Sequence, residues 1–191
     1  MVEPESECSG KGENRRDRYT ENGISPRLIP GKTEHLVEID SDEHDERGWI
    51  KESAEVRTQM MDKRMKKLEG LKQELQEPEF IGDDNFETLL IGWGSIWGPM
   101  EEAVHLLNAD KVGRYAALVF GDVYPMPQRL LKEKAAKARR IINVEQNATG
   151  QLAGLIREET GIVCESSILK YDGRQISGEE IAERIRKGET K

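Results

Sequence analysis

The stretch Thr88-Leu89-Leu90-Ile91-Gly92-Trp93-Gly94-Ser95-Ile96-Trp97-Gly98-Pro99 decides the fold, because it places a strand, a tight turn and a helix start in succession. Its first six residues are almost continuously apolar, which is typical of a strand buried on both faces of a parallel sheet. Gly98-Pro99, followed by Glu101-Glu102, indicates a helix with proline in its first position and acidic residues in its first turn. The stretch therefore predicts a strand that leads through a glycine turn directly into a helix.

The same alternation of strand and helix continues to the C-terminus. Further strands are predicted at 115–120, 141–145 and 167–170, and further helices at 127–139, at 149–160 and from 177 onward. We expect Thr149 to be the N-cap of the middle helix, Gly161 to end it, and Ser177 with Glu180 to form a capping box for the last helix. Repeated strand–helix units predict right-handed crossovers, and hence an α/β three-layer sandwich with a mostly parallel sheet and helices on both faces.

The first 50 residues differ from the rest in charge and composition. They hold 7 basic and 13 acidic side chains, whereas residues 51–191 hold 22 and 24. Glycine, proline and charged residues interrupt every regular period before residue 35, and only 36–39 is typical of a short strand. We therefore predict an extended polar N-terminal arm or linker over 1–50, a long helix with its connector over 51–85, and the α/β domain over 86–191.

The long helix is expected from Ser53 to Gln76, with Pro78 ending it. Apolar residues at helical spacing predict one buried face, made of Ala54, Met61, Met65, Leu68 and Leu75. This face either packs against the chain's own domain or binds a partner, in which case the chain is a helix-mediated adaptor.

The net charge of −8 disfavours functions that need clustered positive charge. Nucleic-acid phosphates and anionic lipids both attract lysine- and arginine-rich segments. The most apolar stretch, 88–100, is short and broken by glycine and proline, and the N-terminus has no signal-peptide pattern. Two cysteines, Cys8 and Cys164, are too few for a disulfide scaffold, a zinc site or an iron–sulfur cluster. We expect a reduced, cytoplasmic location without contact to nucleic acid or membrane.

The glycine-rich turn from Gly92 to Gly98 is one candidate binding site. It lies between a strand and a helix N-terminus, where backbone N–H groups can hold an anion. Its spacing does not match the dinucleotide fingerprint, and no acidic residue follows at the distance that ribose recognition requires. Glycines at a tight turn also need no ligand, so a purely structural turn and a contact with an anion or partner both stay open.

Two other patterns resemble metal sites but fail in detail. Gly121-Asp122, followed by Asn147, has the spacing of the Mg²⁺ and thiamine diphosphate motif, but Val123 stands where that motif has glycine. The acidic turn from Asp40 to Gly48 has Asp45 where a calcium loop needs glycine, and Lys51 where it needs glutamate. We interpret the first match as accidental and the second pattern as a solvated charge run. No nucleophile motif is present.

The segment Glu145-Gln146-Asn147-Ala148-Thr149-Gly150-Gln151 is the most polar strand end in the α/β part. Open α/β sheets place binding surfaces at the carboxyl ends of their strands. Several amides with one carboxylate suit recognition better than bond-making, so we predict a contact surface there.

A series of short motifs follows in order along the chain. The N-terminal motifs are Asn22-Gly23-Ile24-Ser25-Pro26-Arg27, Pro30-Gly31, Ser41-Asp42-Glu43-His44-Asp45-Glu46 with Gly48, and Lys63-Arg64. The later ones are Gly92-Trp93-Gly94-Ser95, Tyr124-Pro125, Val144-Glu145-Gln146-Asn147 with Gly150-Gln151-Leu152, and Lys170-Tyr171-Asp172-Gly173-Arg174. Together they span about Arg18 to Ile185, and in this order they resemble the alpha subunit of 2-oxoacid:ferredoxin oxidoreductases, most closely the 2-oxoglutarate type.

The resemblance implies a domain similar to the C-terminal domain of transketolase, with a five-stranded mixed sheet in which one strand is antiparallel. It also implies that the complete enzyme oxidatively decarboxylates a 2-oxoacid to an acyl-CoA, with thiamine diphosphate, Mg²⁺ and iron–sulfur clusters. The thiamine-binding domain, the cluster cysteines and the Gly-Asp-Gly motif of that family have no counterpart in this sequence. We therefore expect the C-terminal part of an alpha subunit, either shortened or separately encoded, that holds no cofactor itself.

The predicted function is a non-catalytic assembly domain, inactive as this chain alone. Its expected partners are the thiamine-binding alpha domain, the beta subunit, ferredoxin through the complex, and a second copy of the chain. The candidate interface residues are Arg27, His44, Gly94, Ser95, Glu145, Gln146, Asn147, Gly150 and Gln151. The alternative is a stand-alone α/β module that binds a small ligand or nucleotide at the glycine turn.

Overall fold

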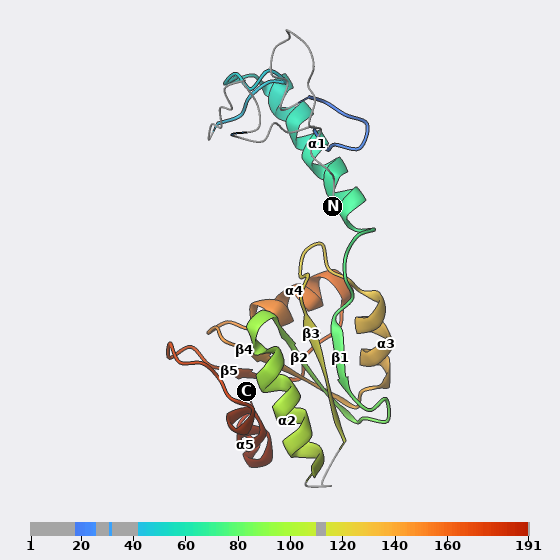
Figure 1. Cartoon of the computed structure of the whole chain (residues 1–191), viewed down its shortest axis with the longest axis vertical. Coiled ribbons are helices and arrows are strands. Elements are labelled where there is room, and N and C mark those ends of the chain that lie inside the picture. Colours follow the sequence, from blue (N-terminus) through green and yellow to red (C-terminus); the bar gives the residue numbers. More distant parts are fainter. Residues whose placement is uncertain (1–17, 26–30, 32–41, 110–113, 191) are drawn as a thin grey trace. The chain divides into compact units, whose positions relative to one another are not determined.

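The computed structural model describes residues 18–25, 31, 42–109 and 114–190, in two compact units divided between Glu74 and Leu75. Figure 1 shows the helix α1 of the first unit and the sheet of the second, and we describe each unit by itself. The predicted strand at 36–39 and the candidate Arg27 lie outside the described residues. The division into parts at residues 50 and 85 stays a prediction.

A five-stranded sheet in the order β1-β3-β2-β4-β5 forms the centre of the second unit. β1 pairs with β3 in the antiparallel direction, and the other pairs are parallel. The strands are β1 (Glu79–Gly82), β2 (Thr88–Trp93), β3 (Tyr115–Phe120), β4 (Arg140–Glu145) and β5 (Ser166–Leu169). In the middle of the sheet, Leu90 stands opposite Ala117 on one side and Ile142 on the other. The predicted mixed, mostly parallel sheet is confirmed.

Helices cover both faces of this sheet, which confirms the three-layer sandwich (Figure 1). One face carries α2 (Trp97–Ala109) and α5 (Gly178–Lys187), which lie side by side. The other face carries α3 (Arg129–Lys137) and α4 (Gln151–Thr160). The last helix begins as expected, because the Ser177 side chain accepts a hydrogen bond from the Glu180 backbone N–H at 3.2 Å.

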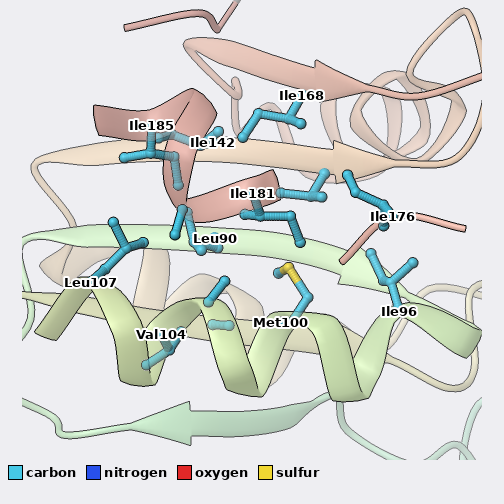
Figure 2. Packing of buried hydrophobic residues seen from close by; sticks show 14 of the residues in the cluster. Leu90, Ile96, Met100, Val104, Leu107, Ile142, Ile168, Ile176, Ile181 and Ile185 are labelled. Atoms are coloured by element: carbon cyan, nitrogen blue, oxygen red, sulfur yellow. The ribbon is translucent and has the colours of Figure 1, made fainter. Parts of the chain in front are cut away.

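The core on the α2 and α5 face is aliphatic. Figure 2 shows Met100 of α2, Ile181 of α5 and Leu90 of β2 converging between the helices and the sheet. All three are fully buried. A buried side chain of this size contributes roughly 1.5–3 kcal/mol relative to leaving it exposed, so this layer stabilises the packing of α2 and α5 on the sheet.

The core on the opposite face includes the phenylalanines. Phe120 of β3, Leu131 of α3 and Ile156 of α4 are fully buried. At the edge of the sheet, Phe80 of β1 packs near Phe86, with ring centroids 5.8 Å apart. The ammonium of Lys134 lies 4.3 Å from the centre of the Phe80 ring, a cation–π contact that helps to hold β1 against α3.

Three elements of the second unit differ from the predictions as follows, besides shifts of one or two residues at the ends of others. The strand β1 was not predicted from the sequence, although the resemblance implied an antiparallel strand. α2 begins at Trp97, after a 3₁₀ turn over Gly94–Ile96, so Pro99 is its third residue rather than its first. Pro99 still lies in the first turn, where no N–H has a helical partner and none is lost. α3 is shorter than 127–139, since it begins only at Arg129.

The first unit is built around α1 (Ala54–Leu71), and Ser53 is its N-cap. The helix ends five residues before the predicted Gln76, at Leu71. Its buried face is also different, because Met60 is the buried apolar residue, whereas Met65 is 47% exposed. The reason is the segment 18–25: a Cβ on Gly23 would lie 2.6 Å from the Lys63 carbonyl oxygen. Lys63 follows Met60 by three positions, so the segment 18–25 packs on that face of the helix.

Glu43 joins the acidic turn to α1 through two arginines. Its carboxylate accepts hydrogen bonds from Arg64 at 2.5 and 3.0 Å and from Arg57 at 2.9 Å. The bonds from Arg64 and then those from Arg57 lower the pKa of Glu43 from 4.5 to about 2, against the opposing effect of burial. The turn therefore has a structural role, in place of the solvated charge run that we predicted.

We expect Ile91→Asp to unfold the second unit. The Ile91 side chain is fully buried in the sheet, and an unpaired buried carboxylate costs several kcal/mol against a total stability of about 5–15 kcal/mol. Circular dichroism melting measures the effect, and Val163→Asp, at a position that is 53% exposed, is the matched control. An Ile91→Asp protein with an unchanged melting curve would contradict the buried central strand.

We expect Glu43→Gln to loosen the acidic turn at neutral pH. Because the folded pKa of Glu43 is depressed, its stabilising effect is complete above pH 4.5 and is lost as the pH falls toward about 2. The Lys51 amide, which donates to the Glu43 carbonyl at 2.9 Å, should exchange its hydrogen about three- to tenfold faster in the variant at pH 7. Glu52→Gln, at an exposed position nearby, should leave this exchange rate unchanged.

Candidate functional site

The candidate site lies at the carboxyl ends of β2 and β4, two neighbouring parallel strands. The chain leaves β2 toward α2 on one face of the sheet and leaves β4 toward α4 on the other. Such a reversal opens a crevice where α/β proteins usually bind ligands. A hollow of about 320 Å³ is found there, and its lining residues are Trp93, Ser95, Ile96, Glu145, Gln146, Asn147 and Gln151.

Glu145 is the centre of this site, and its side chain is completely buried. Its carboxylate accepts side-chain hydrogen bonds from Trp93 Nε1 at 3.3 Å, Asn143 Nδ2 at 2.8 Å and Asn147 Nδ2 at 2.6 Å. It also accepts from the backbone N–H groups of Leu152, at 3.0 and 3.1 Å, and Ala153, at 3.2 Å. These two groups belong to the first turn of α4, where the helix dipole favours a negative charge. The carboxylate therefore caps a helix from inside the fold.

Asn147 and Gly150 shape the loop between β4 and α4. The side-chain oxygen Oδ1 of Asn147 accepts hydrogen bonds from the backbone N–H groups of Thr149, at 3.1 Å, and Gly150, at 2.7 Å. Gly150 has a φ of 65°, a conformation that glycine adopts without strain. The prediction of Thr149 as N-cap is wrong, because Gly150 occupies that position and Glu145 supplies the capping oxygens.

Gln146 connects the site to the loop that precedes α5. Its side-chain oxygen Oε1 accepts a hydrogen bond from the Ile176 backbone N–H at 2.8 Å, and its Nε2 donates to the Gln175 side chain at 3.0 Å. Ile176 is itself part of the core beneath α2 and α5. Gln146 thus holds a loop in place across the end of the sheet.

The glycine turn is shaped by close packing. A Cβ on Gly92 would lie 2.3 Å from Ile96 Cδ1 and 3.1 Å from the Val144 carbonyl oxygen. Gly94, with a φ of 63°, starts the 3₁₀ turn. Glycine at these two positions is therefore explained by the backbone and the core, without a ligand.

The structure brings together most of the candidates predicted from the sequence. Ser95, Glu145, Gln146, Asn147 and Gln151 line the hollow, and Gly94 and Gly150 lie in the two loops beside it. His44 is in the first unit, where its backbone forms an isolated antiparallel bridge with Ile50. Trp93 also lines the hollow but was not among the candidates predicted from the sequence. A large aromatic residue directly at a strand end was the signal that could have identified it.

The candidate reactive groups among the described residues are engaged in other bonds or are weakly reactive. Asp122 accepts the Gln76 backbone N–H at 2.8 Å, and Asn147 is hydrogen-bonded within its own loop, so neither fits the Mg²⁺ motif of thiamine diphosphate. In the described part of the chain, no group of three or more His, Cys, Asp or Glu side chains could hold a metal ion. Burial, and secondarily the charge of Glu145, raises the pKa of the Cys164 thiol to about 11, which makes it a poor nucleophile. None of the described helices is long and apolar enough to cross a membrane.

Comparisons with known proteins agree on one enzyme family, although no protein-family model matches the chain. The alpha subunit of 2-oxoacid:ferredoxin oxidoreductase 1 from Sulfurisphaera tokodaii is 35% identical over 180 residues, which cover 93% of this chain and 28% of that protein. The alpha subunit of oxidoreductase 2 from Aeropyrum pernix is 35% identical over 177 residues, which cover 91% of this chain and 27% of that protein.

A solved structure gives the same result. The 2-oxoglutarate:ferredoxin oxidoreductase from Magnetococcus marinus, with 2-oxoglutarate, coenzyme A and succinyl-CoA bound, matches with a TM-score of 0.73 and 29% identity. The match covers 94% of this chain and 31% of that one. The resemblance found in the sequence is confirmed, and the chain spans little more than a quarter of the length of the curated relatives it matches.

We expect Glu145→Gln to destabilise the second unit by about 3 kcal/mol, since hydrogen bonds to a buried charge are lost and an amide N–H₂ then faces the donors. Thermal melting measures the loss, and the emission of Trp93 should shift because its indole N–H loses an acceptor. Glu158→Gln, on the exposed side of the same helix, is the control and should change neither. A Glu145→Gln protein as stable as the control would show that the carboxylate is not an internal cap.

Proposed function

Since nearly the whole chain is similar to a segment of the alpha subunit of 2-oxoacid:ferredoxin oxidoreductases, we propose that it is a non-catalytic assembly domain of such an enzyme. One observation supports this most directly: the carboxylate and amides of the candidate site are engaged in hydrogen bonds that hold its own loops. A group used in this way is poorly suited to proton transfer or to ligating a cofactor.

The chemistry would then come from the remainder of the enzyme. We propose that thiamine diphosphate with Mg²⁺ supplies the carbanion chemistry there, and that iron–sulfur clusters pass the electrons to ferredoxin. The substrate class is a 2-oxoacid of the 2-oxoglutarate type, and the product is an acyl-CoA. A cytoplasmic location agrees with this reaction and with the small number of cysteines, two in 191 residues.

The contacts of the domain follow from its two units. We propose that the N-terminal arm, including Arg27 and His44, lies on a neighbouring domain. We further propose that the end of the sheet around Gly94, Ser95 and the loop 145–151 contacts the thiamine-binding alpha domain, the beta subunit or a second copy of the chain. Because the site is preformed by internal hydrogen bonds, little ordering cost would remain on assembly.

Reconstitution tests the proposal. The 191-residue chain is mixed with the companion alpha polypeptide that carries the thiamine-binding domain and with the beta subunit from the same source. The rate of 2-oxoglutarate oxidation in the presence of coenzyme A is measured from the reduction of viologen. We expect no turnover by the chain alone. Adding the chain to its companions should raise their turnover rate at least tenfold over the companions without it, because 1.4 kcal/mol of better positioning changes a rate tenfold.

The unfolded Ile91→Asp variant is the negative control for this mixture. Decarboxylation by the isolated chain would refute a non-catalytic role. Tight binding of thiamine diphosphate, coenzyme A or a nucleotide to the isolated chain, seen as a rise in melting temperature, would favour the stand-alone ligand-binding module instead.

A further inference from the structure

Three aromatic side chains are exposed at one edge of the sheet. Trp93 ends β2, Tyr124 follows β3, and Tyr171 follows β5, so all three lie where parallel strands end. Their exposed fractions are 42%, 61% and 67%. Among the described residues of the second unit, the other large apolar side chain exposed to this degree is Val163, which precedes β5 and so lies toward the opposite edge. We call the edge with the three aromatics the carboxyl edge.

Each aromatic residue is attached to a firmly packed part of the fold. The Trp93 indole donates to the buried Glu145 carboxylate at 3.3 Å. Tyr124 is followed by three buried residues, Pro125 to Pro127. Tyr171 follows Lys170, which is 9% exposed and forms an ion pair with Glu180 of α5. Exposed aromatics on a rigid support are the side chains that contribute most at protein interfaces.

Two carboxylates at the carboxyl edge already have partners. The Glu145 carboxylate is satisfied by its five donor groups, and Asp172 pairs with Arg174 at 2.5 Å. Ser95 and Gln151 are exposed, and their side chains make no hydrogen bond with the described residues. The edge therefore offers apolar rings and neutral hydrogen-bonding groups, which complement an uncharged partner surface rather than a phosphate or a carboxylate.

We propose that the carboxyl edge docks on an uncharged protein surface of the remaining oxidoreductase, with Trp93, Tyr124 and Tyr171 as its anchors. This inference rests on the proposed function and identifies the surface and the chemistry that assembly would use. The partner is inferred from the length of the relatives. They are more than three times as long as the segment that this chain matches, and their remaining part provides the partner surface. The hollow of about 320 Å³ beside Trp93 then receives side chains of that surface, which Ser95 and Gln151 contact at its rim.

Binding measurements with single variants test the proposal. The affinity of the full chain for the companion alpha polypeptide and beta subunit is measured by titration calorimetry for the wild type, Trp93→Ala, Tyr124→Ala and Tyr171→Ala. At least two of the three should bind about tenfold or more weakly, as anchor residues do. Val163→Ala is the matched control at the other edge and should bind like the wild type.

Two further measurements make the test specific. Trp93→Phe keeps a ring while losing the bond to Glu145, so it separates loss of contact from loss of stability, and melting curves show whether each variant is folded. Raising sodium chloride from 0.1 to 0.5 M should weaken binding less than about threefold, because the three proposed anchors are uncharged aromatic side chains.

The possible results give distinct answers. Wild-type binding that all three alanine variants retain would overturn the carboxyl edge as the docking surface and leave the proposed function intact. Absence of wild-type binding would overturn both proposals. Anchor variants that abolish only self-association would assign the edge to a second copy, against our proposal. Saturable quenching of tryptophan emission by coenzyme A or adenosine, lost in Trp93→Ala, would assign the edge to a small ligand and likewise refute it.

Discussion

The burial of one carboxylate controls the end of the sheet on which the candidate site is built. Glu145 lies at the last position of β4, and its oxygens are held by an indole, two amides and the first turn of α4. An isolated buried charge is strongly unfavourable, so all of these donors must stay in place for the fold to tolerate it. The carboxylate therefore fixes the start of α4, the Asn147 loop and the Trp93 ring together. A site whose polar groups have this task is a rigid surface, in agreement with an assembly role.

Much of the fold could be predicted from the sequence because the central strands are buried on both faces. Thr88–Trp93 and Tyr115–Phe120 are almost continuously apolar and were predicted with the observed bounds. β1 could not be found in this way, since its four residues include Glu79 and Gly82 and its partner β3 lies more than 30 residues further on. The prediction of the buried face of α1 was wrong for a similar reason. The residue that packs against the helix, Gly23, comes from a distant segment of the sequence.

The polar segment that the sequence singled out lines the hollow at the end of the sheet, but the role of its side chains differs from the prediction. The polar run after β4 predicted a recognition surface, and the structure shows that Glu145 and Asn147 face inward and hold the loops. A pattern of residue types cannot distinguish an amide that awaits a partner from one that is already hydrogen-bonded. The exposed groups are instead the aromatic residues, of which Tyr124 and Tyr171 were quoted only as parts of longer motifs. Such a rigid edge suits the proposed assembly role.

The antiparallel strand β1 has a consequence for how this region can be divided. It occupies the outer edge of β3 and pairs Glu79–Gly82 with Ala116–Val119. Without it, β3 would present unpaired backbone groups beside the apolar residues Leu118 and Phe120, the arrangement that recruits foreign strands and leads to aggregation. A strand of four residues, with a charged Glu79 and a Gly82 that disfavour pairing with a further strand, thus covers the edge of the sheet. The residues that directly follow the division at Leu75 are accordingly part of the second unit's fold, because β1 covers the open edge of its sheet.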